Sequence, residues 1–158
     1  MAPPWLSLAV WHIHCTPTVT AEPYPLQKTS VERNDMTAPS LLVVDDDRAN
    51  CAVISQVLTG MGYTVDVAND GPSALELVEQ NDYDLALLDY QMPGMDGVEL
   101  FQRIRELRPD MLGVFLTAYT RIDTVFSAID AGAFRVLSKP VDFNELVPIL
   151  EELVGKPV

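Results

Sequence analysis

Hydrophobic residues from Leu41 onward fall into two kinds of pattern that alternate along the chain. Short apolar runs such as Leu41–Val44 and Leu85–Leu88 are typical of strands that are covered on both faces. The stretches between them have apolar residues at helical spacing, and Gly or Pro stands near their ends. We expect strands at 41–44, 63–68, 84–88, 111–117 and 134–138, and helices at 48–58, from 69–72 onward, at 98–107, at 121–130, and from 142–144 to about 154.

Two of the expected helices have clear start signals. Asp70 or Gly71 is expected near the cap of the second helix, with Pro72 at its first turn. In the last helix, Asp142 begins a D-x-x-E pattern that is typical of a capping box. Pro148 follows soon after, and proline is tolerated best in a first turn, so we expect that helix to begin at 144.

Strands and helices that alternate with no long loop between them indicate an α/β fold. We predict a doubly wound, five-stranded parallel sheet with helices on both faces, because right-handed crossovers restrict the other arrangements. In such a sheet ligands bind outside the carboxyl ends of the strands. Polar residues at those ends are therefore the first candidates for function.

Four of the apolar runs end on chemically useful side chains. The first is followed by Asp45–Asp47, the third by Asp89, the fourth by Thr117 and the fifth by Lys139. Two like charges about 4 Å apart repel by roughly 4 kcal/mol at an effective dielectric near 20. The three successive acids therefore either splay apart as a solvated turn or hold a hard divalent cation, with Mg²⁺ beside a phosphoryl group as the favoured case.

With these residues in place, the chain resembles the receiver domain of two-component response regulators. The stretches that carry the resemblance are VVDDD (43–47), LLDYQMPGMDG (87–97), FLTA (115–118) and SKP (138–140). It covers roughly Ser40 to Val154 and implies the flavodoxin-like strand order 2-1-3-4-5. That order would bring the first and third strand ends together.

The resemblance also implies how the site works. Asp89 would accept a phosphoryl group from a histidine kinase or a histidine phosphotransfer protein. Mg²⁺ would be held by Asp45, Asp46, Asp89 and the backbone carbonyl of Gln91. Lys139 would neutralise charge on Asp89 and then on the phosphate. The protein would catalyse only its own phosphorylation and dephosphorylation, and would signal through protein–protein contacts.

Further family positions concern the response to phosphorylation. Thr117 would donate a hydrogen bond to the phosphate, assisted by the Ala118 N–H. The family's aromatic switch residue is replaced by Val136, which puts a coupled switch in doubt. Tyr119 is expected to crowd the water that hydrolyses the phosphoryl group, and the peptide bond before Pro140 is expected to be cis. The contact surface implied by the family includes Arg121, Ile122, Phe126, Arg135 and Leu137.

Two other functions compete. Asp45–Asp47 also satisfies the D-x-D pattern of haloacid-dehalogenase-type phosphatases, which use a strand-end Thr and Lys as well. Those enzymes need a further acidic pair after the Lys, and only Asp142 is there. The stretch 87–97 would also be unexplained. The second alternative is a receiver-like interaction module that is never phosphorylated, which the full set of acids, Thr117 and Lys139 argues against.

The charge of the chain limits the classes of partner that it can bind, and its cysteine content indicates the compartment. The 158 residues carry a formal net charge of −13, and residues 40–158 hold 20 acidic against 8 basic residues, a net charge of −12. Such a surface repels nucleic acid, and no basic stripe is visible. The two cysteines make no disulfide framework, which fits a reducing cytoplasm, and Cys51 is expected to be a small buried hydrophobe. We expect a monomer or weak dimer.

Residues 1–39 differ in kind from the rest. They are rich in proline and have no sustained periodicity, and their apolar stretch, Trp5–Val10, lacks the positive region and length expected of a signal peptide and is far shorter than a membrane span. Met36 is a natural start for a receiver. We predict residues 1–39 to be a disordered or extraneous extension and 40–158 to be a receiver domain of the single-domain type.

Overall fold

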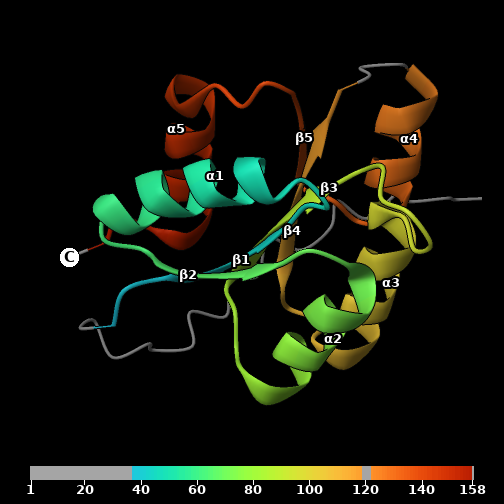
Figure 1. Cartoon of the computed structure of the whole chain (residues 1–158), viewed down its shortest axis with the longest axis horizontal. Helices are drawn as coiled ribbons and strands as arrows, with labels where there is room; N and C mark the ends of the chain where they lie inside the picture. The colour runs from blue at the N-terminus through green and yellow to red at the C-terminus, as the bar shows by residue number, and fades with distance from the viewer. Residues whose placement is uncertain (1–36, 119–121, 158) are drawn as a thin grey trace, which may run out of the picture. The chain divides into compact units, whose positions relative to one another are not determined.

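The computed structural model describes residues 37–118 and 122–157, all within one compact unit of the chain. Strands and helices alternate in it from beginning to end (Figure 1). The strands are β1 (Ser40–Val44), β2 (Thr64–Ala68), β3 (Leu85–Asp89), β4 (Leu112–Thr117) and β5 (Arg135–Ser138). The helices are α1 (Arg48–Gly60), α2 (Gly71–Gln80), α3 (Gly97–Leu107), α4 (Ile122–Asp130) and α5 (Phe143–Val154).

All strand pairs are parallel, and their order is β2-β1-β3-β4-β5. The predicted fold class and strand order are therefore confirmed. In the register of the central pair, Val44 lies opposite Leu88. The residues that come directly after them, Asp45 and Asp89, consequently sit side by side at the carboxyl edge of the sheet.

The sheet is covered on both faces (Figure 1). Because side chains alternate along a strand, Leu41 and Val43 face α1 and α5, whereas Leu42 and Val44 face α2 and α3. The α1/α5 face is mainly aliphatic, and the opposite face includes the rings of Phe101 and Phe115. Burial on both faces explains why these strands are continuous apolar runs.

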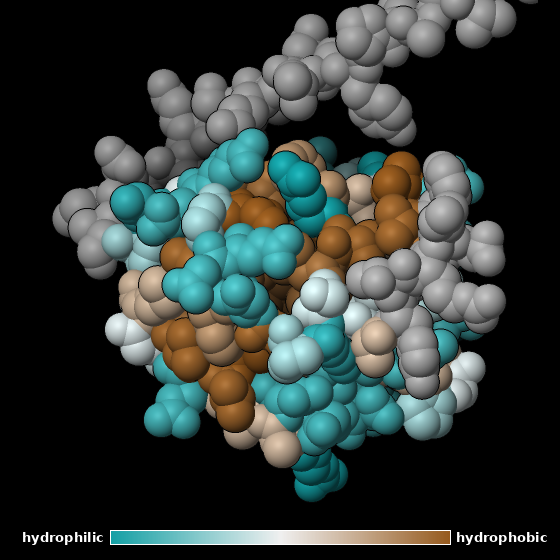
Figure 2. Space-filling model, turned by 90° about the horizontal axis from the view of Figure 1, so that it is seen from above, coloured by the Kyte–Doolittle hydropathy of each residue, from teal (hydrophilic) through white to brown (hydrophobic). Residues whose placement is uncertain are grey.

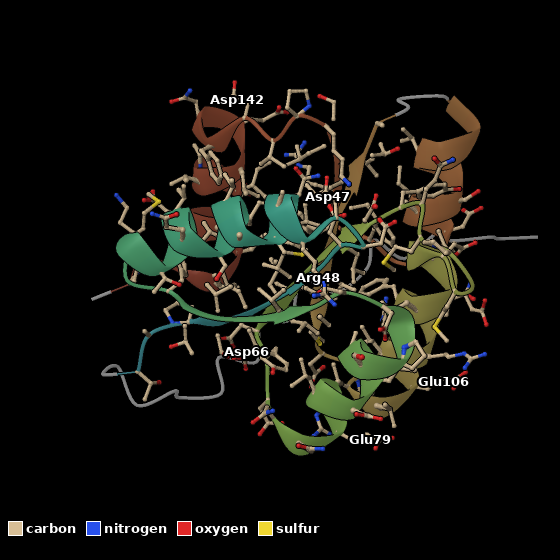
Figure 3. All side chains as sticks on the ribbon, in the orientation of Figure 1. Asp47, Arg48, Asp66, Glu79, Glu106 and Asp142 are labelled. Carbon is tan, nitrogen blue, oxygen red and sulfur yellow. The ribbon has the colours of Figure 1, made fainter. Side chains whose placement is uncertain are left out.

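Aspartates begin four of the helices. The Asp47 carboxylate accepts the Ala49 N–H at 2.9 Å at the start of α1, where Figure 3 places it. Asp70 caps α2 through the Ser73 N–H, which decides between the two predicted cap residues. Asp96 and Asp142 do the same for α3 and α5. Each cap satisfies backbone donors that have no partner within the helix.

The start of α5 differs from the prediction. Asp142 is the cap, as the D-x-x-E pattern indicates, but its carboxylate accepts the Asn144 N–H at 2.8 Å and the helix begins at Phe143. Pro148 is therefore the sixth helical residue and lies beyond the first turn. The helix continues through it because Leu146 and Leu150, on either side, are fully buried against the sheet. This packing outweighs the loss of one backbone hydrogen bond.

One predicted surface residue is wrong. Leu137 is 4% exposed and belongs to the core under α1 and α5, because its neighbours on β5 turn to the other face. Arg135 is exposed, as expected. The side chains of Arg121, Ile122 and Phe126 lie outside the described part of the chain.

Residues 1–36 of the predicted extension also lie outside the described residues. Pro39, which that prediction included, is buried, and its carbonyl accepts the Thr64 N–H at 3.0 Å. Hydrophilic residues cover much of the face shown in Figure 2, and hydrophobic residues gather in separate areas. Among the described helices, none is long and apolar enough to cross a membrane.

Candidate functional site

Three acids from two neighbouring strand ends converge at the carboxyl edge of the sheet. Asp45 follows β1 and Asp89 ends β3, and both are buried, at 1% and 5% exposure. Asp46 is exposed. One carboxylate oxygen of each residue can be chosen so that all three lie within 4.8 Å of one another. The third acid of the sequence triplet, Asp47, instead caps α1, so the three successive acids divide between the site and the helix.

The Asp45 carboxylate is held from several directions. Its Oδ1 accepts the Asp47 N–H at 2.8 Å. Its Oδ2 accepts from the Asn50 side-chain amide at 3.5 Å and from Lys139 Nζ at 2.7 Å. These partners fix Asp45 before any ligand arrives.

Lys139 lies between the two buried acids. Its Nζ is 2.7 Å from Asp45 Oδ2 and 3.1 Å from Asp89 Oδ1. Lys139 follows β5, and the peptide bond to Pro140 is cis. Burial alone would lower the pKa of Lys139, but its hydrogen bonds to the two carboxylates and their charges raise that pKa overall. The side chain is therefore a permanent cation inside the acid cluster.

Asp89 has fewer partners than Asp45. Besides Lys139, its carboxylate accepts the Gln91 N–H at 3.3 Å. Burial raises the pKa of Asp89 to about 6, and Asp45 adds to this rise, while Lys139 and the Gln91 N–H oppose it. At neutral pH the group is mostly ionised but poorly solvated. That is the state expected of a carboxylate nucleophile.

Thr117, one of the residues expected to respond to phosphorylation, lies beside Lys139. Thr117 ends β4 with 1% exposure, and its carbonyl accepts the Lys139 N–H at 2.8 Å. Ala118 comes next and is exposed. Val136 pairs with Phe115 and packs against the core on the α3 side. Tyr119 lies outside the described residues.

Two residues of the site were not among the functional candidates predicted from the sequence. The Asn69 side-chain amide and the Cys51 thiol donate to the Asp45 carbonyl oxygen at 3.0 Å and 3.3 Å. Cys51 is 2% exposed, as predicted for a buried hydrophobe, and burial, then Asp45, raises the pKa of its thiol to about 11. The position of Asn69 directly after β2 was the available signal, because that strand end meets the same edge of the sheet.

The acid cluster fits a small hard cation. Its donor atoms are carboxylate oxygens, which are the ligands that Mg²⁺ prefers. Among the described residues, a single lysine contacts Asp45 and Asp89, so the three acids carry more negative charge than Lys139 neutralises. A divalent cation would relieve that repulsion.

Comparisons with known proteins agree on one family. The sequence profile of the response regulator receiver domain matches residues 41–151. Transcriptional regulatory protein ZraR of Klebsiella oxytoca is 41% identical over 115 residues, covering 73% of this chain and 26% of that protein. DNA-binding transcriptional regulator NtrC of Azospirillum brasilense is 35% identical over 120 residues, covering 76% of this chain and 25% of that protein. The chain thus spans about a quarter of the length of these curated relatives.

A solved structure is also similar. Response regulator protein TrrA of Thermotoga maritima, in complex with Mg²⁺–BeF, superposes with a TM-score of 0.67 at 33% identity. The match covers 73% of this chain and 99% of that one. The profile match extends over more than half of the residues, and the strand order is the one that the resemblance implied. The chain belongs to the receiver domain family of two-component response regulators.

Proposed function

We propose that this receiver accepts a phosphoryl group on Asp89 from the phosphohistidine of a histidine kinase or phosphotransfer protein. The observation that carries the proposal is the convergence of Asp45, Asp46, Asp89 and Lys139 from three strand ends at one point. Among the three acids, Asp89 is the one that is buried and yet loosely held. A buried carboxylate with few donors keeps an oxygen lone pair available for attack.

The transfer step follows from these positions. An Asp89 carboxylate oxygen attacks phosphorus as the bond between phosphorus and the histidine nitrogen breaks. The bonding electron pair stays on the imidazole, which takes a proton from solvent. Phosphoryl transfer depends chiefly on positioning and on neutralisation of charge. Lys139, already 3.1 Å from Asp89, supplies positive charge on one side.

Asp45, Asp46, Asp89 and the Gln91 backbone carbonyl are the groups that would hold Mg²⁺. When bound, the ion supplies positive charge for the oxygens of the transferred group. Asp45 stays fixed by its own hydrogen bonds. The exposed Asp46 carboxylate is in contact with solvent and can exchange solvent water for the ion. The roles of the two acids therefore differ even within one cation site.

After transfer, Thr117 and the Ala118 N–H would bind a phosphate oxygen. Thr117 is joined through its carbonyl to Lys139, so the β4 and β5 ends would respond together. Val136 has no ring to rotate, so any change transmitted to the surface would pass through the main chain. Tyr119, next in the chain, is proposed to shield the phosphoryl group from water.

The wider organisation is part of the same proposal. Residues 40–158 would form the receiver, and residues 1–35 would be dispensable for its folding. The net charge of −12 over 40–158 favours contacts with proteins over direct contact with nucleic acid. A cytoplasmic location fits the free Cys51 thiol, and a monomer or weak dimer fits the charge of the domain.

The test is labelling with acetyl phosphate and Mg²⁺. Asp89→Asn should abolish an acid-labile aspartyl phosphate, and Asp46→Ala should nearly abolish it. Asp82→Asn is the matched control, because the Asp82 side chain is 93% exposed and pairs with Arg108, away from the site. Stoichiometric labelling of the Asp89→Asn protein, mapped to another carboxylate, would contradict the assignment. A label on Asp45 would instead favour the phosphatase-like mechanism.

A further inference from the structure

We infer that Asn69 and Cys51 are positioning residues of the cation site, because they hold the peptide group that joins Asp45 to Asp46. The inference rests on the proposed function, since it concerns the same acids. The Asn69 amide donates to the Asp45 carbonyl oxygen at 3.0 Å, and the Cys51 thiol donates to it at 3.3 Å. We call this pair of donors the carbonyl clamp.

The two donors reach the oxygen from different parts of the fold. Cys51 is on α1, whereas Asn69 lies in the connection between β2 and α2, 24 residues from Asp45. The Asn69 Nδ2 and Cys51 Sγ atoms are themselves 3.5 Å apart. Two bonds from independent elements restrict the rotation of one peptide plane more than either bond would alone.

The clamp matters most for Asp46. The Asp45 side chain is already fixed by the Asp47 N–H, Asn50 and Lys139. Across residues 37–118 and 122–157, by contrast, no hydrogen bond or ion pair holds the exposed Asp46 carboxylate. Its direction therefore depends on its main chain, and the clamped carbonyl belongs to the peptide group that precedes its Cα.

A merely structural role makes a different prediction. If Asn69 and Cys51 only hold α1 and the β2–α2 connection to the sheet, their loss should reduce stability and leave cation affinity unchanged. If they aim Asp46, their loss should weaken Mg²⁺ binding. Groups that orient metal ligands typically change affinity by about 10-fold to 100-fold when removed. The exposed position of Asp46 favours the lower end of that range.

The experiment measures Mg²⁺ dissociation constants of the full chain by NMR titration with the metal alone. Asn69→Ala should weaken binding about 10-fold. In metal-free protein, the same variant should shift the Asp45 carbonyl carbon and the Asp46 amide nitrogen. Asn81→Ala is the matched control: the Asn81 amide donates to the Leu77 carbonyl at 3.2 Å, which is the same kind of bond away from the site. This variant should leave both measurements unchanged.

Cys51→Ala should also weaken Mg²⁺ binding. The double variant should lose less Mg²⁺-binding free energy than the sum of the losses in the two single variants, because both donors bond to one oxygen. Urea unfolding of each variant separates a role in stability from a role in orienting Asp46. Lower stability with an unchanged Mg²⁺ dissociation constant for Asn69→Ala would overturn the inference. Asp46→Ala distinguishes the remaining failure: if it too leaves Mg²⁺ binding unchanged, the proposed cation site itself is wrong.

Discussion

The ends of β1 and β3 are neighbours in the sheet, and each carries a buried aspartate, yet the two carboxylates have very different surroundings. Asp45 has a short backbone hydrogen bond at 2.8 Å, the Asn50 amide, and the closer contact with Lys139. Asp89 has a backbone hydrogen bond at 3.3 Å and the longer contact with the same lysine. The difference comes from the segment of chain that leaves each strand.

After β1 the chain enters α1 within three residues, so the N–H of the cap residue Asp47 and the side-chain amide of Asn50 both reach the Asp45 carboxylate. After β3 a loop of seven residues, 90–96, intervenes before α3, and it leaves Asp89 with little support from a helix. The same side chain at neighbouring strand ends thus has more donors in one case and fewer in the other, which matches the proposed roles of Asp45 as a metal ligand and Asp89 as the nucleophile. Substitutions at and around the two strand ends test that contrast, beginning with the largest expected effect.

Lys139→Met should separate phosphorylation of Asp89 from Mg²⁺ binding most strongly. Loss of the cation should lower the rate of phosphorylation by acetyl phosphate by about 100-fold or more, because a preorganised positive group is lost. Mg²⁺ affinity should stay the same or rise, since the ion no longer competes with Lys139 for the two carboxylates. Labelling kinetics and a Mg²⁺ titration check this. Lys156→Met is the control, as the Lys156 side chain is 75% exposed and pairs with Glu151.

Gly97→Ala should disturb the β3 end while leaving the β1 end intact. A Cβ at Gly97, the first residue of α3, would collide with the Asp89 carbonyl oxygen and lie 3.1 Å from the Phe115 ring. We expect phosphorylation to slow by roughly 10-fold, and the free energy of unfolding to fall by about 1–3 kcal/mol, as for other overpacked sites. Labelling rates and urea unfolding measure the two effects.

Gly113→Ala provides the matched comparison. Its Cβ would collide with the Phe101 ring near the start of β4, at the opposite end of the sheet from Asp89. This variant should lose a similar free energy of unfolding, about 1–3 kcal/mol, and keep its phosphorylation rate. Equal slowing in both variants would mean that general destabilisation, and not the position of Asp89, explains the Gly97 result.

Asp47→Ala sharpens the contrast within the acidic triplet. Removing the α1 cap should cost about 1 kcal/mol in the free energy of unfolding, and Asp47→Ser should restore most of it. Mg²⁺ affinity should change far less than in Asp46→Ala, because Asp47 faces the helix and not the cation site. A weakening equal to that of Asp46→Ala would show that the third acid is a ligand.

Tyr83→Phe tests the Asp66 carboxylate, whose partner is the neutral Tyr83 hydroxyl and not a lysine. The Tyr83 hydroxyl donates to Asp66 Oδ2 at 2.7 Å, and burial, then this bond, raises the pKa of Tyr83 above its usual value near 10. The neutral Tyr83 hydroxyl therefore contributes its full stabilisation below about pH 10, the pKa of an unfolded tyrosine. That stabilisation is lost as the pH rises from about 10 toward the higher pKa of Tyr83 in the folded protein. At pH 10 the loss is about 0.4 kcal/mol.

In the Phe variant this alkaline loss should disappear, which thermal unfolding between pH 8 and 10.5 can measure on the order of tenths of a kcal/mol. Tyr63, whose pKa is also raised by burial and by Glu151, would still titrate and provides an internal reference. An unchanged alkaline slope in Tyr83→Phe would indicate that the pKa of Tyr83 is not raised in the folded protein, which would contradict both its burial and its hydrogen bond to Asp66.

Much of the site could be predicted because it consists of strand ends. Apolar runs located β1, β3, β4 and β5, and parallel strands bring their carboxyl ends to one edge. That geometry alone assembled Asp89 and Lys139 with the acids after β1. Where prediction was wrong, the reason lay in packing: Leu137 was assigned to the surface although the pleat turns it into the core, and the α5 start was placed one residue late because the burial of Leu146 and Leu150 was not visible.

By itself, the sequence determined the order of strands and helices, the acids and the lysine at strand ends, and the aspartates that begin helices, because these depend on periodicity and on signals within a few residues. Only the tertiary structure decided that Lys139 lies between Asp45 and Asp89 and is closer to Asp45. The bond from Lys139 to Asp45 spans 94 positions and the one from Asn69 spans 24, so both depend on how the β1, β2 and β5 ends meet. Local patterns place a carboxylate at an edge and supply its nearest donors, but the Lys139 and Asn69 donors reach Asp45 from distant parts of the chain.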